Sequence, residues 1–196
     1  CHYAATKIIA ERLVLAANSE TLRTTALRPH LVWGPGDTQI IPRLLERGRQ
    51  GGLRMVGSGS NRVDISYIDN VADAHLLAAE NLAGTGTAAG EAFFISQGEP
   101  VVLWAWINAL FARVGVQPIS RRVLLARARR AGRLLEVLFA LLRLSGEPPM
   151  TRFLAEQLAL SHWFSIAKAE KILGYHPRVS ERQGVDRLVA WLTGAN

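Results

Sequence analysis

The chain has 196 residues; 49% of them are hydrophobic, 20% are charged, and the formal net charge is +7. This composition excludes a disordered chain and is sufficient for one or two compact units. The single cysteine, Cys1, excludes an intramolecular disulfide, and the five histidines show no paired spacing typical of a metal site. The chain does not begin with a signal pattern, and no uncharged apolar run approaches about 20 residues, so we expect a cytoplasmic protein without a bound metal.

The first quarter of the chain shows helical and extended patterns in turn. Residues 1–18 predict a helix that is already in progress at the first residue, because apolar side chains recur with helical spacing. Residues 24–33 predict a strand that runs into a turn at 34–37, and a proline within this run favours a strand end or an edge position. A helix over 38–48, capped by its first residue, is expected to follow.

Short strands and helices continue to residue 192. The patterns predict extended runs at 53–56, 63–68 and 92–96, and helices at 69–78, 101–114, 121–144, 166–173 and 181–192. No internal repeat or low-complexity segment interrupts them.

The segment 121–144 combines arginines with leucines. Six arginines and no acid lie in its first part: Arg121, Arg122, Arg127, Arg129, Arg130 and Arg133. The leucines between and after them predict a basic amphipathic helix or helix pair, which Pro148-Pro149 would end. A solvated helix face is one interpretation. Attachment to an anionic membrane surface, or docking to a partner that delivers an apolar substrate, is the other. We do not expect nucleic acid as a partner, because no aromatic-lined basic groove accompanies the arginines.

Tyr3 and Lys7 stand four residues apart in the first predicted helix, so their side chains lie on one face. A free tyrosine titrates near a pH of about 10, and a cation held close stabilises the phenolate and lowers its pKa. The Tyr3 hydroxyl could then exchange a proton with a carbonyl or alcohol oxygen. The same spacing also arises by chance in helices, so the surrounding motifs decide between a catalytic and an incidental pair.

Further motifs accompany this pair in order along the chain. They are Tyr3–Lys7, Ala10–Arg12, Leu27–Pro29, Val32–Asp37, Arg62–Ala74 and Phe93–Pro100. The series resembles the extended short-chain dehydrogenase/reductase family and, within it, the 3β-hydroxysteroid dehydrogenase branch. Two later segments, Glu147–Phe153 and Leu173–Pro177, are similar to bacterial 2-alkyl-3-oxoalkanoate reductases.

The resemblance implies an α/β fold. The chain would form the C-terminal part of a doubly wound, Rossmann-type NAD(P)-binding fold with a small, mainly helical substrate lobe. Residues 1–36 would belong to the dinucleotide-binding domain and 37–196 to the substrate lobe, with 62–96 returning to the Rossmann domain. In the family, the glycine-rich pyrophosphate turn, the serine or threonine that polarises the substrate and the residue that selects NAD or NADP all precede the tyrosine. We therefore expect these groups outside this chain, and both NAD and NADP remain candidate cofactors.

The resemblance also implies roles for individual residues. Tyr3 would be the general acid or base, and Lys7 would tune it and bind the nicotinamide ribose. Arg62 and Asp64 match positions that face the substrate lobe, although they could equally form an ordinary surface pair. We expect Arg62 and Tyr67 to contact the substrate and Asp64 to have a structural role. The implied cofactor-side residues are Tyr3, Lys7, Pro29, His30, Leu31 and Val32, the last three mainly through their backbone. For these three, a buried strand end is the alternative interpretation.

The implied activity is hydride transfer between a nicotinamide cofactor and a bulky, apolar ketone or the matching alcohol, with a 2-alkyl-3-oxo acid as the first substrate choice. A 3β-hydroxysteroid or sterol dehydrogenase and a sugar-nucleotide epimerase or dehydratase are the alternatives. A non-catalytic binding module is a hypothesis of another class, because half of the expected cofactor site precedes Tyr3. We therefore expect the 196-residue chain alone to be inactive, and a homodimer is a further expectation for the enzyme.

Overall fold

The computed structural model describes residues 2–146 and 148–194, so Cys1 and Glu147 lie outside the described residues. The chain divides into two compact units. Unit 1 comprises 1–37, 64–100 and 164–196, and unit 2 comprises 38–63 and 101–163. None of the described helices is long and apolar enough to cross a membrane.

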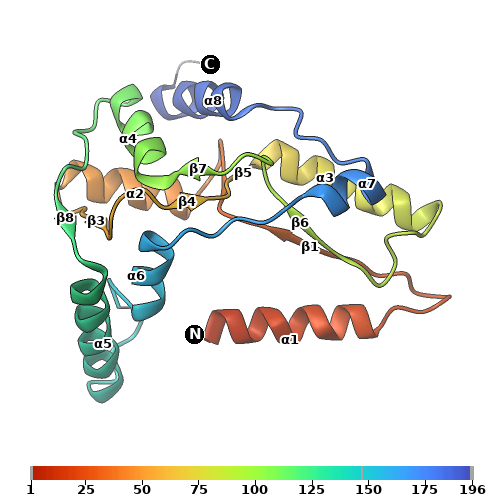
Figure 1. Ribbon diagram of the computed structural model, residues 1–196, viewed down its shortest axis with the longest axis horizontal. Helices are drawn as coiled ribbons and strands as arrows, with labels where there is room; N and C mark the ends of the chain where they lie inside the picture. The colour runs from red at the N-terminus through yellow and green to blue at the C-terminus, as the bar shows by residue number, and fades with distance from the viewer. Residues whose placement is uncertain (1, 147, 195–196) are drawn as a thin grey trace. The chain divides into compact units, whose positions relative to one another are not determined.

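Unit 1 is built on a pair of parallel strands with helices on both sides. Strand β1 (Ala26–Pro29) pairs with β6 (Ala92–Ile95), and Leu27 lies opposite Phe93. Helix α1 lies on one side of this pair, and helices α3 and α7 lie on the other (Figure 1). The elements of unit 1 are α1 (His2–Ala16), β1, β2 (Val32–Trp33), β5 (Ser66–Tyr67), α3 (Ile68–Ala83), β6, α7 (Ala167–Leu173) and α8 (Glu181–Thr193).

The core of unit 1 lies between β6 and the helices α3 and α7. It contains Val71, Ala74 and Ala78 of α3, Phe93 and Ile95 of β6, and Ala169, Leu173 and Tyr175 in and after α7. Parallel strands joined through a helix need a long crossover connection, and α3 supplies it between β1 and β6. The predicted helix 1–18 and strand 92–96 are therefore confirmed within two residues at each end.

The sequence predicts one continuous strand over 24–33, and this prediction is wrong. The structure contains two strands, β1 and β2, because Leu31 adopts a positive φ of 44° that no extended strand allows. Each strand has its own parallel partner, since β1 pairs with β6 and β2 pairs with β5. Pro29 ends β1, as its missing N–H favours.

Residues 164–196 lie in unit 1, although the sequence assigns them to the substrate lobe. The buried side chain of Asn70 on α3 binds this segment. Its amide nitrogen donates to the Val179 carbonyl (2.8 Å), and its oxygen accepts from the backbone N–H groups of Arg178 (3.0 Å) and Val179 (2.9 Å). The Tyr175 hydroxyl donates to the Ser96 carbonyl at 2.9 Å. These long-range bonds hold the last two helices against α3 and β6.

Two helix ends in this segment match the sequence signals. Gly174 ends α7 with a φ of 66°, a left-handed conformation that glycine adopts without a Cβ clash. Ser180 caps α8, and its hydroxyl accepts from the Gln183 N–H while the Gln183 side chain accepts from the Ser180 N–H. The predicted helices 166–173 and 181–192 are therefore confirmed.

Unit 2 is mainly helical, with three short strand pairings. Strand β3 pairs in parallel with β8, β4 pairs antiparallel with β7, and Val63 forms an isolated bridge with His162. Phe111 and Val116 pack closely against Gly48 of α2. The elements of unit 2 are α2 (Ile40–Arg49), β3 (Met55–Val56), β4 (Arg62–Val63), β7 (Val101–Val102), α4 (Leu103–Arg113), β8 (Arg122–Val123), α5 (Leu125–Leu141) and α6 (Arg152–Ala159).

Three predictions for unit 2 need correction. Gln39 rather than Thr38 is the N-cap of α2. The first residues of the segment 121–144 form strand β8, and only α5 is helical. Helix α6 is not among the predicted elements; its N-cap Thr151, whose hydroxyl accepts from the Leu154 N–H at 3.0 Å, is the sequence signal that could have identified it.

Candidate active site

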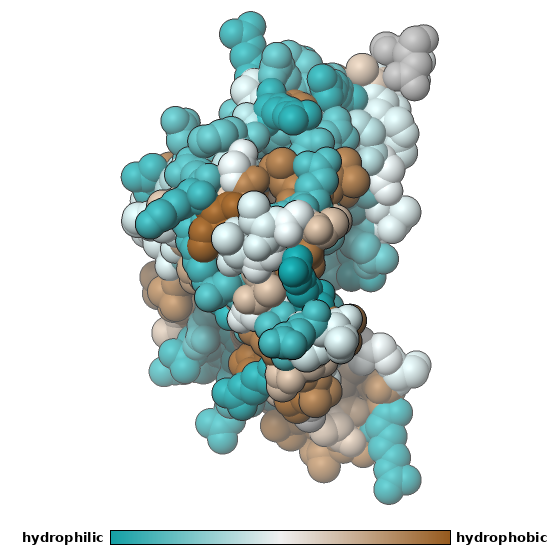
Figure 2. Space-filling view, turned by 90° about the vertical axis from the view of Figure 1, so that its right-hand side faces the viewer, coloured by the Kyte–Doolittle hydropathy of each residue, from teal (hydrophilic) through white to brown (hydrophobic). Residues whose placement is uncertain are grey.

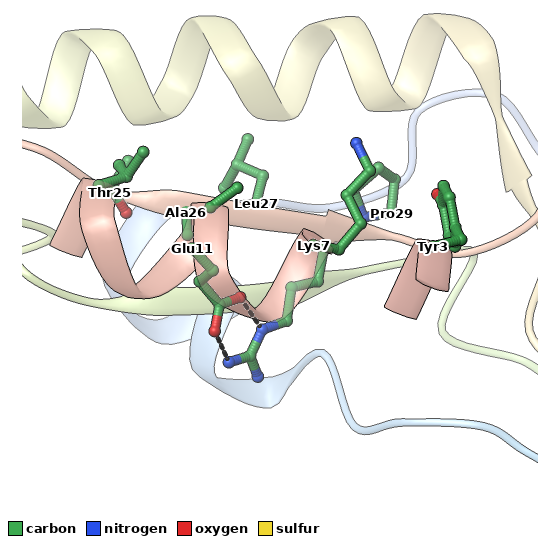
Figure 3. Close-up of a pocket in the computed structure, with 10 residues that line it drawn as sticks. Tyr3, Lys7, Glu11, Thr25, Ala26, Leu27 and Pro29 are labelled. Carbon is green, nitrogen blue, oxygen red and sulfur yellow. Dashed lines mark hydrogen bonds and ion pairs between the residues drawn. The ribbon is translucent and has the colours of Figure 1, made fainter. Parts of the chain in front are cut away.

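A groove of about 470 Å³ lies between α1 and β1, a volume in the range of small-molecule sites. Its walls belong entirely to unit 1. Figure 3 shows Lys7 and Tyr3 projecting from successive turns of α1 beside Pro29 of β1. The lining residues are Tyr3, Lys7, Ala10, Glu11, Val14, Thr25, Ala26, Leu27, Arg28 and Pro29.

Tyr3 and Lys7 are adjacent in this groove. The Lys7 ammonium lies 5.6 Å from the centroid of the Tyr3 ring, within the range of a cation–π interaction. The Tyr3 side chain is 64% exposed, so its hydroxyl is accessible to a ligand. One helical turn separates the two residues, and the Thr6 hydroxyl donates to the Tyr3 carbonyl at 2.8 Å within the same turn. This arrangement places an acid–base hydroxyl and a cation on one accessible surface.

A charged pair in the same groove joins α1 to β1. The Arg28 guanidinium donates to both carboxylate oxygens of Glu11, at 2.5 and 2.6 Å. The hydrogen bond from Arg28 lowers the pKa of Glu11, and burial opposes this shift only in part. The Arg28 side chain also lies 5.0 Å from the centroid of Phe94 on β6. The pair therefore fixes the spacing between the helix that carries Tyr3 and the strand that forms the opposite wall.

The segment after β1 is held by its backbone. Ser66 on β5 is fully buried, and its hydroxyl lies 2.8 Å from the His30 carbonyl and 3.0 Å from the Ile95 carbonyl. The Ser66 N–H donates to the Leu31 carbonyl at 3.1 Å, and Val32 pairs with Ser66 in the β2–β5 register. These contacts hold the left-handed turn at Leu31 in place, so His30, Leu31 and Val32 follow Pro29 directly on a fixed path.

The sequence analysis did not identify Ser66, which positions the backbone that follows β1. It lies within the motif Arg62–Ala74, but a serine in a short strand carries no signal that its hydroxyl binds the carbonyl of His30, after β1, and that of Ile95 on β6. The Glu11–Arg28 pair was missed for the same reason. Its partners are 17 positions apart, beyond the reach of the spacing rules that identified Tyr3 and Lys7.

The two substrate candidates lie outside the groove. The Tyr67 side chain is 1% exposed and packs edge-to-face on Trp33, with ring centroids 5.2 Å apart. Burial raises the pKa of Tyr67, and nearby Asp69 adds to the shift. Arg62 belongs to β4 of unit 2, where its backbone N–H donates to the Ser161 hydroxyl at 2.9 Å. In the described part of the chain, no three histidine, cysteine or acidic side chains gather as metal ligands.

Comparisons with known proteins support the sequence resemblance. The family described as the 3-beta hydroxysteroid dehydrogenase/isomerase family matches residues 1–126. The 2-alkyl-3-oxoalkanoate reductase of Stenotrophomonas maltophilia is 55% identical over 188 residues, which cover 96% of this chain and 57% of that protein. The sterol-4-alpha-carboxylate 3-dehydrogenase of Schizosaccharomyces pombe is 37% identical over 194 residues, covering 97% and 56%. The chain therefore spans a little over half the length of these relatives.

A solved structure shows the same fold. A dTDP-glucose 4,6-dehydratase from Streptomyces venezuelae, crystallised with NAD, superposes with a TM-score of 0.66 at 23% identity, covering 95% or more of this chain and half of that one. With helices on both sides of the β1–β6 pair, the fold is a Rossmann-type α/β fold, as predicted. The chain belongs to the 3-beta hydroxysteroid dehydrogenase/isomerase family.

Proposed function

We propose that the protein containing this chain is an NAD(P)-dependent oxidoreductase that reduces the ketone of a 2-alkyl-3-oxo acid. The observation that carries the proposal is the accessible pair of Tyr3 and Lys7 in the groove between α1 and β1. The similarity to the Stenotrophomonas maltophilia reductase, at 55% identity, selects the substrate class. The similarity to the Schizosaccharomyces pombe enzyme, at 37%, makes a sterol-4-carboxylate the second candidate substrate.

The groove fits the nicotinamide end of such a cofactor. Its wall offers the Lys7 ammonium, which can donate to ribose hydroxyl oxygens, and the Tyr3 hydroxyl within the same helical turn. A bound NAD(P)H supplies the hydride. We assign to Pro29, His30, Leu31 and Val32 the role of a fixed wall beside the nicotinamide, because Ser66 holds the backbone that follows β1.

The chain's own residues would handle the proton. Tyr3 donates the proton of its hydroxyl to the ketone oxygen as that oxygen gains negative charge. Lys7 stabilises the phenolate that remains on Tyr3, because its ammonium is one helical turn away. Glu11 and Arg28 hold α1 against β1, so the Tyr3 hydroxyl keeps its position during the transfer. In the reverse direction, Tyr3 accepts the proton of the alcohol.

Substitution of Tyr3 tests this proposal. In the full product of the gene that encodes this chain, Tyr3→Phe removes only the exchangeable proton, so we expect kcat to fall about 10²–10⁴-fold. The dissociation constant for NADPH or NADH should stay within about threefold, because Lys7 and the groove are unchanged. Stopped-flow oxidation of the cofactor measures kcat, and fluorescence titration measures binding. A Tyr3→Phe enzyme with normal kcat would exclude Tyr3 as the proton donor.

Two lysine substitutions, one in the groove and one outside it, test the role of the Lys7 ammonium. We expect Lys7→Met to lower both kcat and cofactor affinity, whereas Lys171→Met, at an exposed position on α7, should change neither. Comparing kcat/KM for a 2-alkyl-3-oxo acid and for a sterol-4-carboxylate separates the two substrate candidates.

Tight NAD(P)H binding and turnover by the 196-residue chain alone would contradict the expectation that the cofactor site needs residues that precede Tyr3. If the full product neither binds NAD(P)H nor turns over a ketone, the binding-module hypothesis replaces the enzyme.

A long-chain 2-alkyl-3-oxo acid is amphiphilic, and its apolar chains favour partition from water into a bilayer. We therefore propose that the enzyme also makes a peripheral membrane contact through the segment 121–144.

A further inference from the structure

Apolar surface alone does not locate the substrate on this protein. On the face shown in Figure 2, hydrophobic residues in brown lie among hydrophilic residues in teal and do not form one continuous surface. Within unit 1, exposed apolar side chains occur on α1 (Ile8), α3 (Leu76) and α8 (Trp191). A polar group that the candidate substrates share therefore gives a sharper criterion than exposed apolar area.

The two candidate substrates share a carboxylate beside the reacting carbon. In a 2-alkyl-3-oxo acid, the carboxylate is attached to the carbon next to the ketone. In a sterol-4-carboxylate, it is attached to the carbon next to position 3, where the dehydrogenase acts. The carboxylate and one hydrogen bond therefore span about 6 Å from the reacting carbon to the group that binds the acid. This group must lie near the Tyr3 hydroxyl, which meets the oxygen on the reacting carbon.

Basic side chains of unit 1 are the natural partners for this carboxylate. Among the described residues, the basic side chains that line the groove are those of Lys7 and Arg28. Arg28 donates to both carboxylate oxygens of Glu11, and the Lys7 ammonium lies 5.6 Å from the centroid of the Tyr3 ring. His30 is the next basic residue in the sequence, and it directly follows β1 at its carboxyl end. Ligands of parallel α/β sheets bind outside this end of the strands.

Four contacts within unit 1 hold His30, which is half-buried. Its carbonyl lies 2.8 Å from the Ser66 hydroxyl, and its N–H donates to the same hydroxyl oxygen at 3.3 Å. Its ring nitrogen Nδ1 lies 3.0 Å from the Asp64 carbonyl, and its ring meets Phe164 edge-on with centroids 6.1 Å apart. Leu31 follows with a φ of 44°, a conformation that a leucine keeps only where its surroundings hold it. Both the backbone and the ring of His30 are therefore fixed in advance of a ligand.

The residues behind the His30 ring are themselves firmly packed. Asp64 is 1% exposed, and its carboxylate accepts from the Phe164 N–H at 2.6 Å. The Phe164 ring stacks on Phe94 of β6, with centroids 4.1 Å apart, and the Arg28 guanidinium lies 5.0 Å from the Phe94 centroid. A continuous series of side-chain contacts therefore connects the His30 ring with the wall of the Tyr3 groove.

The contact with Asp64 determines which ring nitrogen can bind a ligand. A carbonyl oxygen only accepts hydrogen bonds, so we assign the hydrogen of this contact to Nδ1. A ligand would then be bound through Nε2. An anion close to an imidazole stabilises the imidazolium, in which both ring nitrogens donate. The His30 ring can therefore give a charge-assisted hydrogen bond to a carboxylate and keep its contact with the Asp64 carbonyl.

We propose that the His30 imidazole binds the carboxylate of the substrate and makes the enzyme selective for 3-oxo acids over uncharged ketones. Tyr3 meets the ketone oxygen and His30 meets the carboxylate, so two fixed points orient the reacting carbon. The same donor serves both candidate substrates. This selectivity rests on the proposed function and deepens it, because it names the side chain that recognises the acid.

Two substrates that differ only in charge test the proposal. In the full product of the gene, oxidation of a 2-alkyl-3-hydroxy acid is compared with oxidation of its methyl ester, which is the proposed reaction in reverse. We expect a kcat/KM at least about tenfold higher for the acid, because a hydrogen bond to a charged group contributes this much or more. His30→Ala should bring the acid-to-ester ratio close to one, mainly through a higher KM for the acid. The ratio cancels any effect on folding or cofactor binding, which both substrates share.

His75 supplies the matched control. Its Nδ1 also bonds to a backbone carbonyl, that of Val71 at 2.8 Å, but it lies at an exposed position on α3. His75→Ala should keep the wild-type ratio. His30→Gln, which retains an N–H donor without a charge, should give an intermediate ratio. Fluorescence titration with the hydroxy acid in the presence of NAD(P)H, where no turnover occurs, should show the same loss of acid affinity in His30→Ala.

Two results would overturn the proposal and leave the proposed function intact. They are a wild-type enzyme with equal kcat/KM for acid and ester, and a His30→Ala enzyme that keeps the wild-type ratio. If the full product oxidises neither compound, the proposed function fails, and the selectivity fails with it. Circular dichroism verifies that each variant is folded.

Discussion

The core of unit 1 and the α5–α6 pair of unit 2 are held together by different contacts. In unit 1, buried polar side chains bind backbone groups far away in the sequence, as Asn70 binds residues 178–179 and Ser66 binds His30. In unit 2, α5 and α6 are joined by close backbone approach at Gly132 and by partly exposed ion pairs such as Arg152–Glu136. An unsatisfied buried polar group costs much more than a lost exposed ion pair, so the segments that Asn70 and Ser66 bind are more strictly positioned than α5 is against α6.

This difference matches the roles that we propose for the two units. Proton transfer needs the Tyr3 hydroxyl within about 0.5 Å of its productive position, and buried hydrogen bonds provide such fixed positions. The peripheral membrane contact that we propose for the segment 121–144 tolerates larger movements, so α5 and α6 can be held together less strictly. The comparison can be tested by removing one key contact from each unit.

The largest effect on stability should come from Asn70→Ala. This substitution removes the acceptor for the backbone N–H groups of Arg178 and Val179, the second of which is buried, and one of two donors to the Val179 carbonyl, the other being Gln97. We expect the free energy of unfolding to fall by about 3 kcal/mol. Urea unfolding followed by circular dichroism measures the change. Gln50→Ala, at an exposed position, is the control and should stay within about 0.5 kcal/mol of wild type. An Asn70→Ala effect as small as the control would show that unit 1 does not depend on this side chain.

Gly132→Ala should have a smaller effect, localised to unit 2. The new Cβ would approach the Thr151–Arg152 peptide within 3.0 Å, so α5 and α6 must separate. Overpacking of this kind costs about 1–3 kcal/mol, and the better helix propensity of alanine returns about 1 kcal/mol, which leaves a net loss of about 0–2 kcal/mol. Hydrogen exchange should show faster exchange in α5 and α6 and unchanged exchange in α3. Gly52→Ala, where the nearest atom is 4.0 Å away, is the control. Uniform loss of protection across both units would contradict the localisation.

The sequence predicted the local features well, because caps, turns and side-chain periodicity act over a few residues. The bounds of the helices at 166–173 and 181–192 and the Tyr3–Lys7 spacing are of this kind. The motif order around Tyr3 also indicated the family correctly. Knowledge of the family therefore supplied the fold, which local patterns alone could not.

Long-range contacts explain what the sequence could not predict. The break at Leu31 depends on Ser66, a residue 35 positions away in the numbering that binds the flanking backbone. The placement of residues 164–196 in unit 1 depends on Asn70, whose neighbours in the sequence resemble any helix start. In both cases a buried polar side chain satisfies backbone groups that only the folded chain brings near. The roles of Tyr3 and Lys7 remain predictions, because no measured activity tests them.

The smallest expected effects concern two ion pairs, Glu11–Arg28 in unit 1 and Glu136–Arg152 in unit 2. They allow a direct comparison of the two units. Glu11 and Glu136 are similarly accessible, with side-chain exposures of 25% and 27%. The hydrogen bond from Arg28 lowers the pKa of Glu11, and the backbone N–H of Arg152 lowers that of Glu136. A carboxyl whose folded-state pKa is depressed stabilises the protein above its unfolded pKa of about 4.3, and this contribution is lost as pH falls through the folded value. Wild-type stability should therefore decrease as pH falls below about 4, and less steeply in Glu11→Gln or Glu136→Gln.

Double-mutant cycles should separate the two pairs. The Glu11–Arg28 pair is bidentate, and Arg28 is also held over Phe94, so less side-chain entropy is lost on pairing. Because solvent screens both pairs, we expect a coupling of about 0.5–1 kcal/mol for Glu11–Arg28 and about 0.2–0.5 kcal/mol for Glu136–Arg152. Urea unfolding of the single and double glutamine variants at neutral pH measures both couplings. A larger coupling in unit 2 would mean that its α5–α6 contact is defined as strictly as the Tyr3 groove, and the division between a fixed unit and a tolerant one would fail.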